Sequence, residues 1–304
     1  MKTFDFEWRI LDFFDNFKSD ILNTINQYFS NIFGSIGLII IFLVIYWVIN
    51  KEKGLHIGFS LAFSMVINNF LKGLILRKRP FEIEGKEYLR KLSEAKDHAT
   101  GTSFPSGHSM NSASLYTGLI VNYRHKRFLI LHIISVILLV LVGITRIYLG
   151  VHFPTDVIVG INLGVLVAIV TTFLQEALTN KKWILYVIIT MIFAPFLFFN
   201  MFGKDFIKSY GMILGITVGH LLEVKFVDFN ASCSASKKIN RLIIGLIVVG
   251  GLYLIYNVVP NPIHDNFVFV LVMHFLISFS GIFLVPLIFK KIEGTNKAIR
   301  SNIL

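Results

Sequence analysis

FPSGHS, residues 104–109, lies where the polar loop 76–105 meets a long apolar stretch. A helix start needs only a capping residue, yet these six residues also supply a flexible backbone and a titratable imidazole. Ser106 can cap the helix with its hydroxyl, and the unpaired backbone N–H groups of a first helical turn attract anions. Gly107 lets a ligand approach the backbone closely, and His108 projects from the same turn. The stretch therefore predicts half of a phosphate site at the start of a membrane helix.

The composition around this stretch is that of a membrane protein. Of the 304 residues, 55% are hydrophobic, 14% aromatic and only 15% charged, which is too apolar for an ordinary soluble domain. The net charge of +11 fits cytoplasmic loops that face anionic head groups better than it fits nucleic acid. Cys233 is the only cysteine, which excludes an intrachain disulfide and a multi-cysteine metal site. A lipid bilayer is the predicted partner, and no nucleic acid is expected.

Nine apolar stretches have membrane-spanning length and predict an all-α, polytopic transmembrane helical bundle. They are residues 35–50, 54–75, 106–123, 128–149, 154–175, 183–202, 206–222, 240–258 and 266–289. Within the seventh stretch, Gly211, Gly215 and Gly219 recur at a spacing that favours close helix packing.

Residues 1–34 combine apolar side chains at roughly helical spacing with charges that are too frequent for a span. An amphipathic segment lying in the membrane interface explains this pattern, and so does an amphipathic helix packed on the protein. The sequence leaves both open. The first residues, MKTFDFEWRI, lack the continuous apolar core of a signal peptide, so no cleaved leader is expected.

Lys and Arg are concentrated in the connections after the first, third, fifth and seventh spans and at the C-terminus. The connection 259–265 contains neither. Because positive charge marks cytoplasmic loops, we expect a cytoplasmic C-terminus and an outward-facing loop 76–105.

Three polar stretches at span ends share the outward face under this topology. They are KGLILRKRP with Lys72 and Arg79, PSGH, and TRIYLGVHFPTD with Arg146, His152 and Asp156. Single cations at span ends usually anchor the helix. That explanation accounts poorly for two His, one Asp and three cations together, because such groups are costly to place in a membrane. The three cations add to the positive charge that a phosphate needs, with Arg suited to bidentate contact.

The third stretch supplies a nucleophile. Pro154 is a natural first helical residue, so Asp156 falls in the first turn, with His152 just before it. A carboxylate bonded to one ring N–H fixes the tautomer and leaves a lone pair on the other nitrogen. A helix-capping acid beside an unrelated boundary histidine is the alternative reading, and the nearby cations count against it.

The combination Lys-x6-Arg-Pro, Pro-Ser-Gly-His and Arg-x5-His-x3-Asp resembles the three-part signature of the type 2 phosphatidic acid phosphatase superfamily, which includes glucose-6-phosphatase and vanadium haloperoxidases. Thr145 stands where the family usually has Ser and keeps the hydroxyl. The resemblance implies a phosphatase core at residues 35–176, between the amphipathic segment 1–34 and additional transmembrane helices at 177–304.

The resemblance also implies the roles of the site residues. His152 attacks phosphorus and forms a phosphohistidine, Asp156 orients it, and His108 protonates the leaving oxygen and later activates water. The phosphoryl oxygens are held by Lys72, Arg79, Ser106, the Gly107 N–H and Arg146. Neither a metal nor another cofactor is implied, because these groups supply the positive charge.

Several functions compete with a lipid phosphatase. A protein that only binds lipid head groups has no need of the His152–Asp156 pair, and haloperoxidases are soluble. A lipid phosphotransferase uses the same intermediate, and a sugar-phosphate phosphatase of the glucose-6-phosphatase type stays open. A site at the membrane boundary favours lipid substrates, such as phosphatidic acid, phosphatidylglycerol phosphate or a polyprenyl pyrophosphate. The sequence thus predicts a multi-pass cell-membrane hydrolase whose active site faces outward.

Overall fold

The computed structural model describes residues 3–34, 36–85 and 101–301, and the regular structure of these residues is entirely helical. Most of the loop 76–105 therefore lies outside the described residues. The chain divides into two compact units. The first unit contains Met1–Phe42, His56–Ala177 and Phe199–Phe206, and the second contains Leu43–Leu55, Leu178–Phe198 and Ile207–Leu304.

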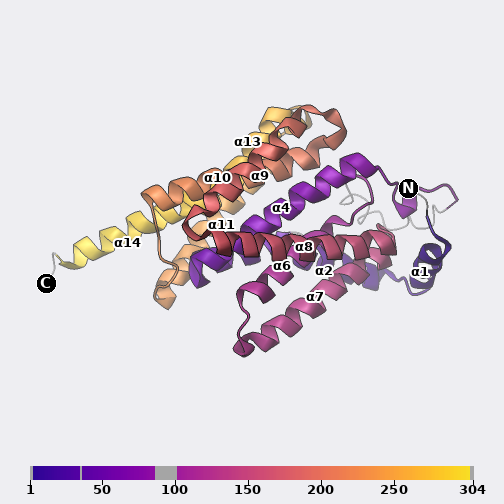
Figure 1. Ribbon diagram of the computed structural model, residues 1–304, viewed down its shortest axis with the longest axis horizontal. Helices are drawn as coiled ribbons and strands as arrows, with labels where there is room; N and C mark the ends of the chain where they lie inside the picture. Colours follow the sequence, from indigo (N-terminus) through magenta and orange to yellow (C-terminus); the bar gives the residue numbers. More distant parts are fainter. Residues whose placement is uncertain (1–2, 35, 86–100, 302–304) are drawn as a thin grey trace. The chain divides into compact units, whose positions relative to one another are not determined.

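The first unit is a bundle in which α7 packs against α6, α2 and α1 (Figure 1). Its helices are α1 (Asp5–Asp15), α2 (Asp20–Gly34), most of α3 (Ile36–Val44) and of α4 (Lys51–Ile75), the short η2 (Pro80–Glu82), α6 (Gly107–Asn122), η4 (Lys126–Phe128), α7 (Leu129–Tyr148) and α8 (Pro154–Leu178).

Burial differs sharply between the two neighbouring helices α6 and α7. Most of α6 is buried, including Met110, Leu115 and Tyr116. By contrast, α7 carries many exposed large apolar side chains, such as Ile130 and Ile137. Exposed apolar surface of this extent is stable in lipid, where every backbone group of a helix is already hydrogen-bonded. We therefore interpret α7 as lipid-facing and α6 as a central helix.

Glycines bring α8 close to α6. A Cβ atom on Gly160 would lie 2.8 Å from the Ser106 carbonyl oxygen, and one on Gly164 would lie 2.1 Å from that of Met110. Real Cβ atoms do not approach so closely, so only glycine allows this contact, as is common between membrane helices. The close approach places the start of α8, with Asp156, beside the start of α6.

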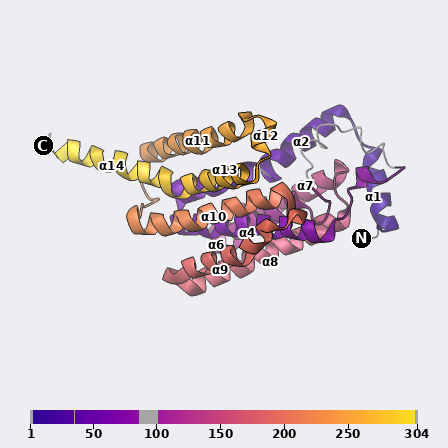
Figure 2. The same cartoon turned by 90° about the horizontal axis from the view of Figure 1, so that it is seen from above.

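The second unit contains η1 (Ile45–Ile49), η5 (Thr179–Lys181), α9 (Lys182–Phe193), η6 (Ala194–Phe198), most of α10 (Gly203–Phe226), α11 (Ala235–Val258), α12 (Asn261–His264), α13 (Phe267–Phe279), η8 (Ser280–Leu284) and α14 (Val285–Ser301). The short η7 (Asn200–Phe202) belongs to the first unit. Within the second unit α11 lies along α13 (Figure 2). Gly211, Gly215 and Gly219 of α10 meet the backbone or side chains of α13 and η8, so the prediction of close packing at these glycines is confirmed.

Six described helices or joined helices are long and apolar enough to cross a membrane. They are Asp20–Ile49, Lys51–Glu82, Lys126–Tyr148, Pro154–Leu178, Ala235–Val258 and Phe267–Glu293. Lys182–Phe198 and Asn200–Phe226 meet at 103° and give a seventh span if they count as one. The prediction of a multi-pass helical bundle is confirmed, but the count of nine is not. Two predicted spans form the bent pair, and α6, with 16 residues, is shorter than the other six.

The N-terminal residues do not form one uniform interfacial segment. α2 joins α3 in the candidate span Asp20–Ile49, so the predicted boundary at residue 34 is not confirmed. α1 contacts α7 and buries Glu7 and Leu11, while Phe6 and Phe13 are exposed. This helix matches the second reading of the sequence, an amphipathic helix packed on the protein.

Candidate active site

Three helix ends meet within the first unit: the end of α4 with its following loop, the start of α6, and the connection between α7 and α8. The Ser106 backbone N–H donates to the Asp156 carbonyl oxygen at 3.0 Å, and Arg79 Nη1 lies 3.2 Å from His152 Nε2. The structure thus brings together residues that lie 50 and 73 positions apart in the sequence.

Asp156 sits where the sequence predicts it, in the first turn of α8, which begins at Pro154. Its Oδ2 accepts from the backbone N–H of Phe153 at 2.9 Å, which satisfies a donor that a helix start leaves free. The same oxygen accepts from Ser103 Oγ at 2.5 Å, while Oδ1 accepts from Arg77 Nη1 at 2.5 Å. The carboxylate is fully buried, so these donors fix it and compensate its charge.

Ser103 stands between Asp156 and His152. His152 Nδ1 is 3.7 Å from Asp156 Oδ2, longer than a hydrogen bond, and 3.4 Å from Ser103 Oγ. The Ser103 hydroxyl donates to the carboxylate and faces the ring nitrogen with its oxygen. A hydrogen-bonded route from Asp156 to His152 therefore passes through the Ser103 hydroxyl, and the two side chains also lie within ion-pair distance of each other.

The contact between Arg79 and His152 defines the imidazole tautomer. A guanidinium has donors only, so Nε2 accepts from Arg79 Nη1 at 3.2 Å and carries the lone pair. The ring proton is then on Nδ1, on the side of Ser103 and Asp156. Arg79 is itself fixed by bonds to the Val151 and Gly101 carbonyl oxygens. Nε2, the nitrogen that carries the lone pair, thus lies beside a cation that can also hold a phosphoryl oxygen.

His152 lies in the connection between α7 and α8, outside the candidate spans, and is 2% exposed. Burial, together with the positive charges of Arg79, Arg146 and Lys72, holds the pKa of its imidazole well below the usual range. The ring is therefore neutral at physiological pH, which is the form that can act as a nucleophile.

The start of α6 presents Gly107 and His108 to this site. Gly107 is the first helical residue, and a Cβ atom there would lie 3.0 Å from Asn68 Oδ1. Ser106 occupies the capping position, but its hydroxyl lies 2.8 Å from the hydroxyl of Ser109 and does not bond to a backbone N–H. The prediction of a side-chain cap is wrong in this state, because a second serine one turn later is the closer partner.

The remaining cations surround the two histidines. Lys72 and Arg146 both lie within electrostatic range of His108 and His152. Arg146 Nη1 donates to Ser30 of α2 at 2.7 Å, whereas its buried Nε has no partner among the described residues. Arg146 also ends α7, where a cation is favoured by the helix dipole. The eight residues predicted from the sequence therefore gather in one place.

Four residues of this site were not predicted: Ser103, Arg77, Thr155 and Glu7. Arg77 is 2% exposed and connects Asp156 to Glu7 of α1. Arg77 lies between Lys72 and Arg79 in the quoted stretch, and Ser103 directly precedes FPSGHS. Their closeness to the motifs was a usable signal. Glu7 had none, because it is one of several charges in an amphipathic stretch.

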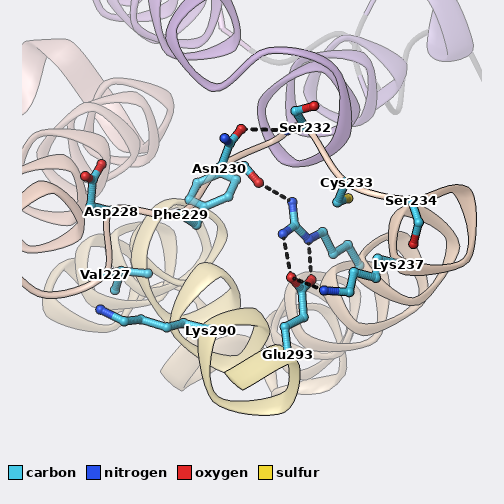
Figure 3. A pocket seen from close by; sticks show the side chains of 11 residues that line it. Val227, Asp228, Phe229, Asn230, Ser232, Cys233, Ser234, Lys237, Lys290 and Glu293 are labelled. Carbon is cyan, nitrogen blue, oxygen red and sulfur yellow. Dashed lines mark hydrogen bonds and ion pairs between the residues drawn. The ribbon is translucent and has the colours of Figure 1, made fainter. Parts of the chain in front are cut away.

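A cavity of about 450 Å³ lies wholly within the second unit (Figure 3). Its cations are already paired: Arg241 binds both carboxylate oxygens of Glu293 and the carbonyl oxygens of Trp47 and Asn230. Lys237 also contacts Glu293, at 3.4 Å. Through these bonds Arg241 connects the loop before α11 to α14. None of the predicted site residues lines this cavity.

Comparison with known proteins agrees with the motif geometry. Residues 53–180, which contain all eight predicted site residues, match the PAP2 superfamily. Residues 207–297 match the transmembrane extension of PAP2 superfamily phosphatases. The chain is a member of the PAP2 superfamily. The family assignment drawn from the motifs is therefore confirmed, and the later helices belong to a recognised extension of the same superfamily.

Three relatives with different names are similar to parts of this PAP2 protein. Phosphatidylglycerophosphatase B of Bacillus subtilis is 49% identical over 77 residues, covering 23% of this chain and 37% of that protein. Undecaprenyl-diphosphatase of Sulfolobus acidocaldarius is 28% identical over 43% of this chain and 60% of its own length. Glucose-6-phosphatase catalytic subunit 1 of Haplochromis xenognathus is 34% identical over 35% of this chain and 41% of its own length. The chain thus spans less than two thirds of each relative.

Proposed function

We propose that this PAP2 protein is an integral-membrane phosphatase that hydrolyses lipid-linked phosphate monoesters or pyrophosphates through a phosphohistidine on His152. The observation that supports this proposal best is the orientation of the imidazole. Its Nε2 lone pair lies beside Arg79, while Nδ1 is backed by Ser103 and Asp156. A binding protein needs the cations but not a neutral, oriented imidazole among them.

In the proposed first step, His152 Nε2 attacks phosphorus in line with the leaving oxygen. The N–P bond forms as the P–O bond breaks, and His108, protonated in the substrate complex, gives that proton to the departing alcohol or phosphate. The imidazole becomes cationic, and the negative charge of Asp156, relayed by Ser103, stabilises it. His108 then takes a proton from water, whose oxygen displaces His152 and releases inorganic phosphate.

The charge on the phosphoryl oxygens is proposed to be held by Lys72, Arg79 and Arg146 together with the first N–H groups of α6. The unpaired Nε of Arg146 is one donor available for this purpose. Preorganised donors of this kind stabilise a transition state in which negative charge spreads over the equatorial oxygens. We propose that Ser106 joins them once its hydroxyl turns from Ser109, and that turnover needs no metal ion.

The substrate is proposed to be a lipid phosphate or pyrophosphate because the site lies at the ends of candidate membrane spans. A phosphate on a lipid anchor could enter from the bilayer edge without leaving the membrane. Two of the relatives are named for phosphatidylglycerophosphate and for undecaprenyl diphosphate. We further propose that the site faces outward and that α6 and both arms of the bent pair cross the membrane, giving nine spans.

A soluble sugar phosphate is the second candidate substrate, because one relative is a glucose-6-phosphatase catalytic subunit. The deciding experiment measures phosphate release by the purified protein in detergent micelles. The panel contains phosphatidic acid, phosphatidylglycerol phosphate, a polyprenyl pyrophosphate and glucose 6-phosphate. We expect higher kcat/KM on at least one lipid than on the sugar phosphate, and no release with His152→Ala.

Each other result has a definite meaning. A preference for glucose 6-phosphate over every lipid would replace the substrate assignment and leave the chemistry intact. Transfer of phosphate to an added alcohol, with little release into water, would identify a phosphotransferase.

A further inference from the structure

Glu7 of α1 is a fully buried acid that belongs to the charge network of Asp156. Its Oε2 accepts from Arg77 Nη2 at 2.7 Å and from the backbone N–H of Phe4 at 2.9 Å, and its Oε1 accepts from the Thr155 hydroxyl. The bond to Phe4 is an ordinary capping contact at a helix start. Such a contact needs no burial and no cation, so capping alone does not explain Glu7.

Arg77 joins Glu7 to the proposed catalytic carboxylate. Its Nη1 donates to Asp156 Oδ1 at 2.5 Å and to Thr155 Oγ1 at 2.7 Å, while Nη2 faces Glu7. The guanidinium lies 4.1 Å from the ring centroid of Phe153, which fixes its plane. One rigid cation is therefore shared between two buried carboxylates on different helices.

The sharing has an electrostatic consequence. If Arg77 faced Asp156 alone, the two charges would cancel in a buried site where they interact strongly. Asp156 would then have little negative charge left for the cationic imidazole that forms during phosphoryl transfer. With Glu7 present, the three groups carry a net charge of one negative unit, and Arg77 is drawn partly toward α1. Asp156 keeps both its position and part of its charge for His152.

We infer that Glu7 is a positioning residue for the proposed phosphoryl transfer, acting through Arg77 on Asp156. The inference rests on the proposed function. Glu7 lies outside the residues that match the PAP2 superfamily, 53–180, so this role makes the N-terminal helix α1 a part of the catalytic machinery. Binding of the phosphate itself, which depends on other cations, should not require Glu7.

The test compares Glu7→Gln with the wild type in detergent, using the preferred substrate of the panel above and inorganic phosphate as a competitive inhibitor. We expect kcat to fall by about tenfold, the lower end of the loss found when the hydrogen-bonding partner of a metal-ligating histidine is removed. KM and the Ki of phosphate should stay within about twofold. Asp5→Asn, at an exposed carboxylate two residues away, is the matched control and should behave as the wild type.

A double-mutant cycle then tests the route. In an Arg77→Lys background, which keeps the positive charge but cannot fork between two carboxylates, Glu7→Gln should lower kcat by clearly less than it does in the wild type. Equal effects in both backgrounds would show that Glu7 acts independently of Arg77 and would overturn the inference. So would an unchanged kcat, or parallel losses in kcat and phosphate affinity, since these indicate a merely structural role.

If Glu7→Gln does not give a folded protein in detergent, Glu7→Asp takes its place. We then expect a smaller fall in kcat, again with an unchanged Ki of phosphate. An unchanged kcat for Glu7→Asp would then overturn the inference. The proposed function fails separately, if the wild type releases no phosphate or if His152→Ala keeps its rate. An active wild type beside an unaffected Glu7 variant would overturn this inference alone.

Discussion

Arg79 Nη1 donates to Nε2 of His152 at 3.2 Å, so a cation lies against the ring nitrogen that carries the lone pair. The arrangement orders the ring before any substrate is bound. In the proposed mechanism one guanidinium serves two partners in turn, the resting imidazole and the phosphoryl oxygen, so Arg79 would link phosphate binding to release of the nucleophile.

Replacing the two histidines should have different effects. His152→Ala removes the proposed nucleophile and should abolish phosphate release, whereas His108→Ala removes the proposed proton donor and should still bind phosphate analogues. Phosphate release and inhibitor binding, measured on both variants, separate the two roles. A His152→Ala protein with near-normal rate would exclude the phosphohistidine mechanism.

Metal chelation should leave activity intact. The proposed positive charge comes from Lys72, Arg79, Arg146 and helix N–H groups, so excess EDTA should not lower the rate. Orthovanadate, which can mimic five-coordinate phosphorus, should inhibit strongly. Both are measured by phosphate release from the same lipid substrate. Activity that is lost in EDTA and restored by Mg²⁺ would contradict the proposed charge balance.

The acid limb of kcat/KM should lie below the usual imidazole range. Burial and nearby cations lower the pKa of His152, so the neutral nucleophile persists into acidic solution. Arg79→Gln removes one of those cations, so the pKa should rise and the acid limb should move to higher pH. Both profiles are recorded with one substrate, so that its own ionisation cancels. An identical limb in the two proteins would contradict the assignment to His152.

Ser103→Ala should slow the chemical step. The change removes the hydroxyl that lies between Asp156 and His152, so kcat should fall by about tenfold or more while KM changes little. Ser112→Ala is the matched control, because this buried serine of α6 donates to the Phe33 carbonyl oxygen and to no other described residue. An equal loss in both variants would point to general destabilisation.

Gly164→Ala should destabilise the first unit. A Cβ atom there would lie 2.1 Å from the Met110 carbonyl oxygen and 2.7 Å from the Ala113 Cβ, so α6 and α8 would have to separate. Overpacking of this kind costs about 1–3 kcal/mol, measured as a lower Tm in detergent. Gly250→Ala in α11, where nothing lies within 4 Å, should leave the Tm unchanged or raise it slightly. Equal Tm values for the two variants would contradict the close approach of α6 and α8.

Local chemistry made much of this site predictable. Pro154 begins α8 as expected, because its fixed φ suits a first helical turn and its missing N–H costs nothing there. Ser106 shows the limit: its capping position was predictable, but the choice between a backbone N–H and the Ser109 hydroxyl depends on the rotamers of two side chains. The boundary at residue 34 is not confirmed, because α2 continues with α3 in the candidate span Asp20–Ile49 and buries its polar residues Gln27 and Ser30.

The sequence by itself determined the membrane class, the helical secondary structure and the PAP2 family, and it predicted the eight residues that the structure brings together. Each of these depends on composition or on spacing along one chain. Only the tertiary structure decided that Arg77 is shared between Asp156 and Glu7, and that Ser103 stands between Asp156 and His152. A charge in a sequence carries no sign of its partner, because pairing depends on which helices are close enough to exclude water between them. Here that closeness comes from glycines of α8 and from the packing of α1 on α7.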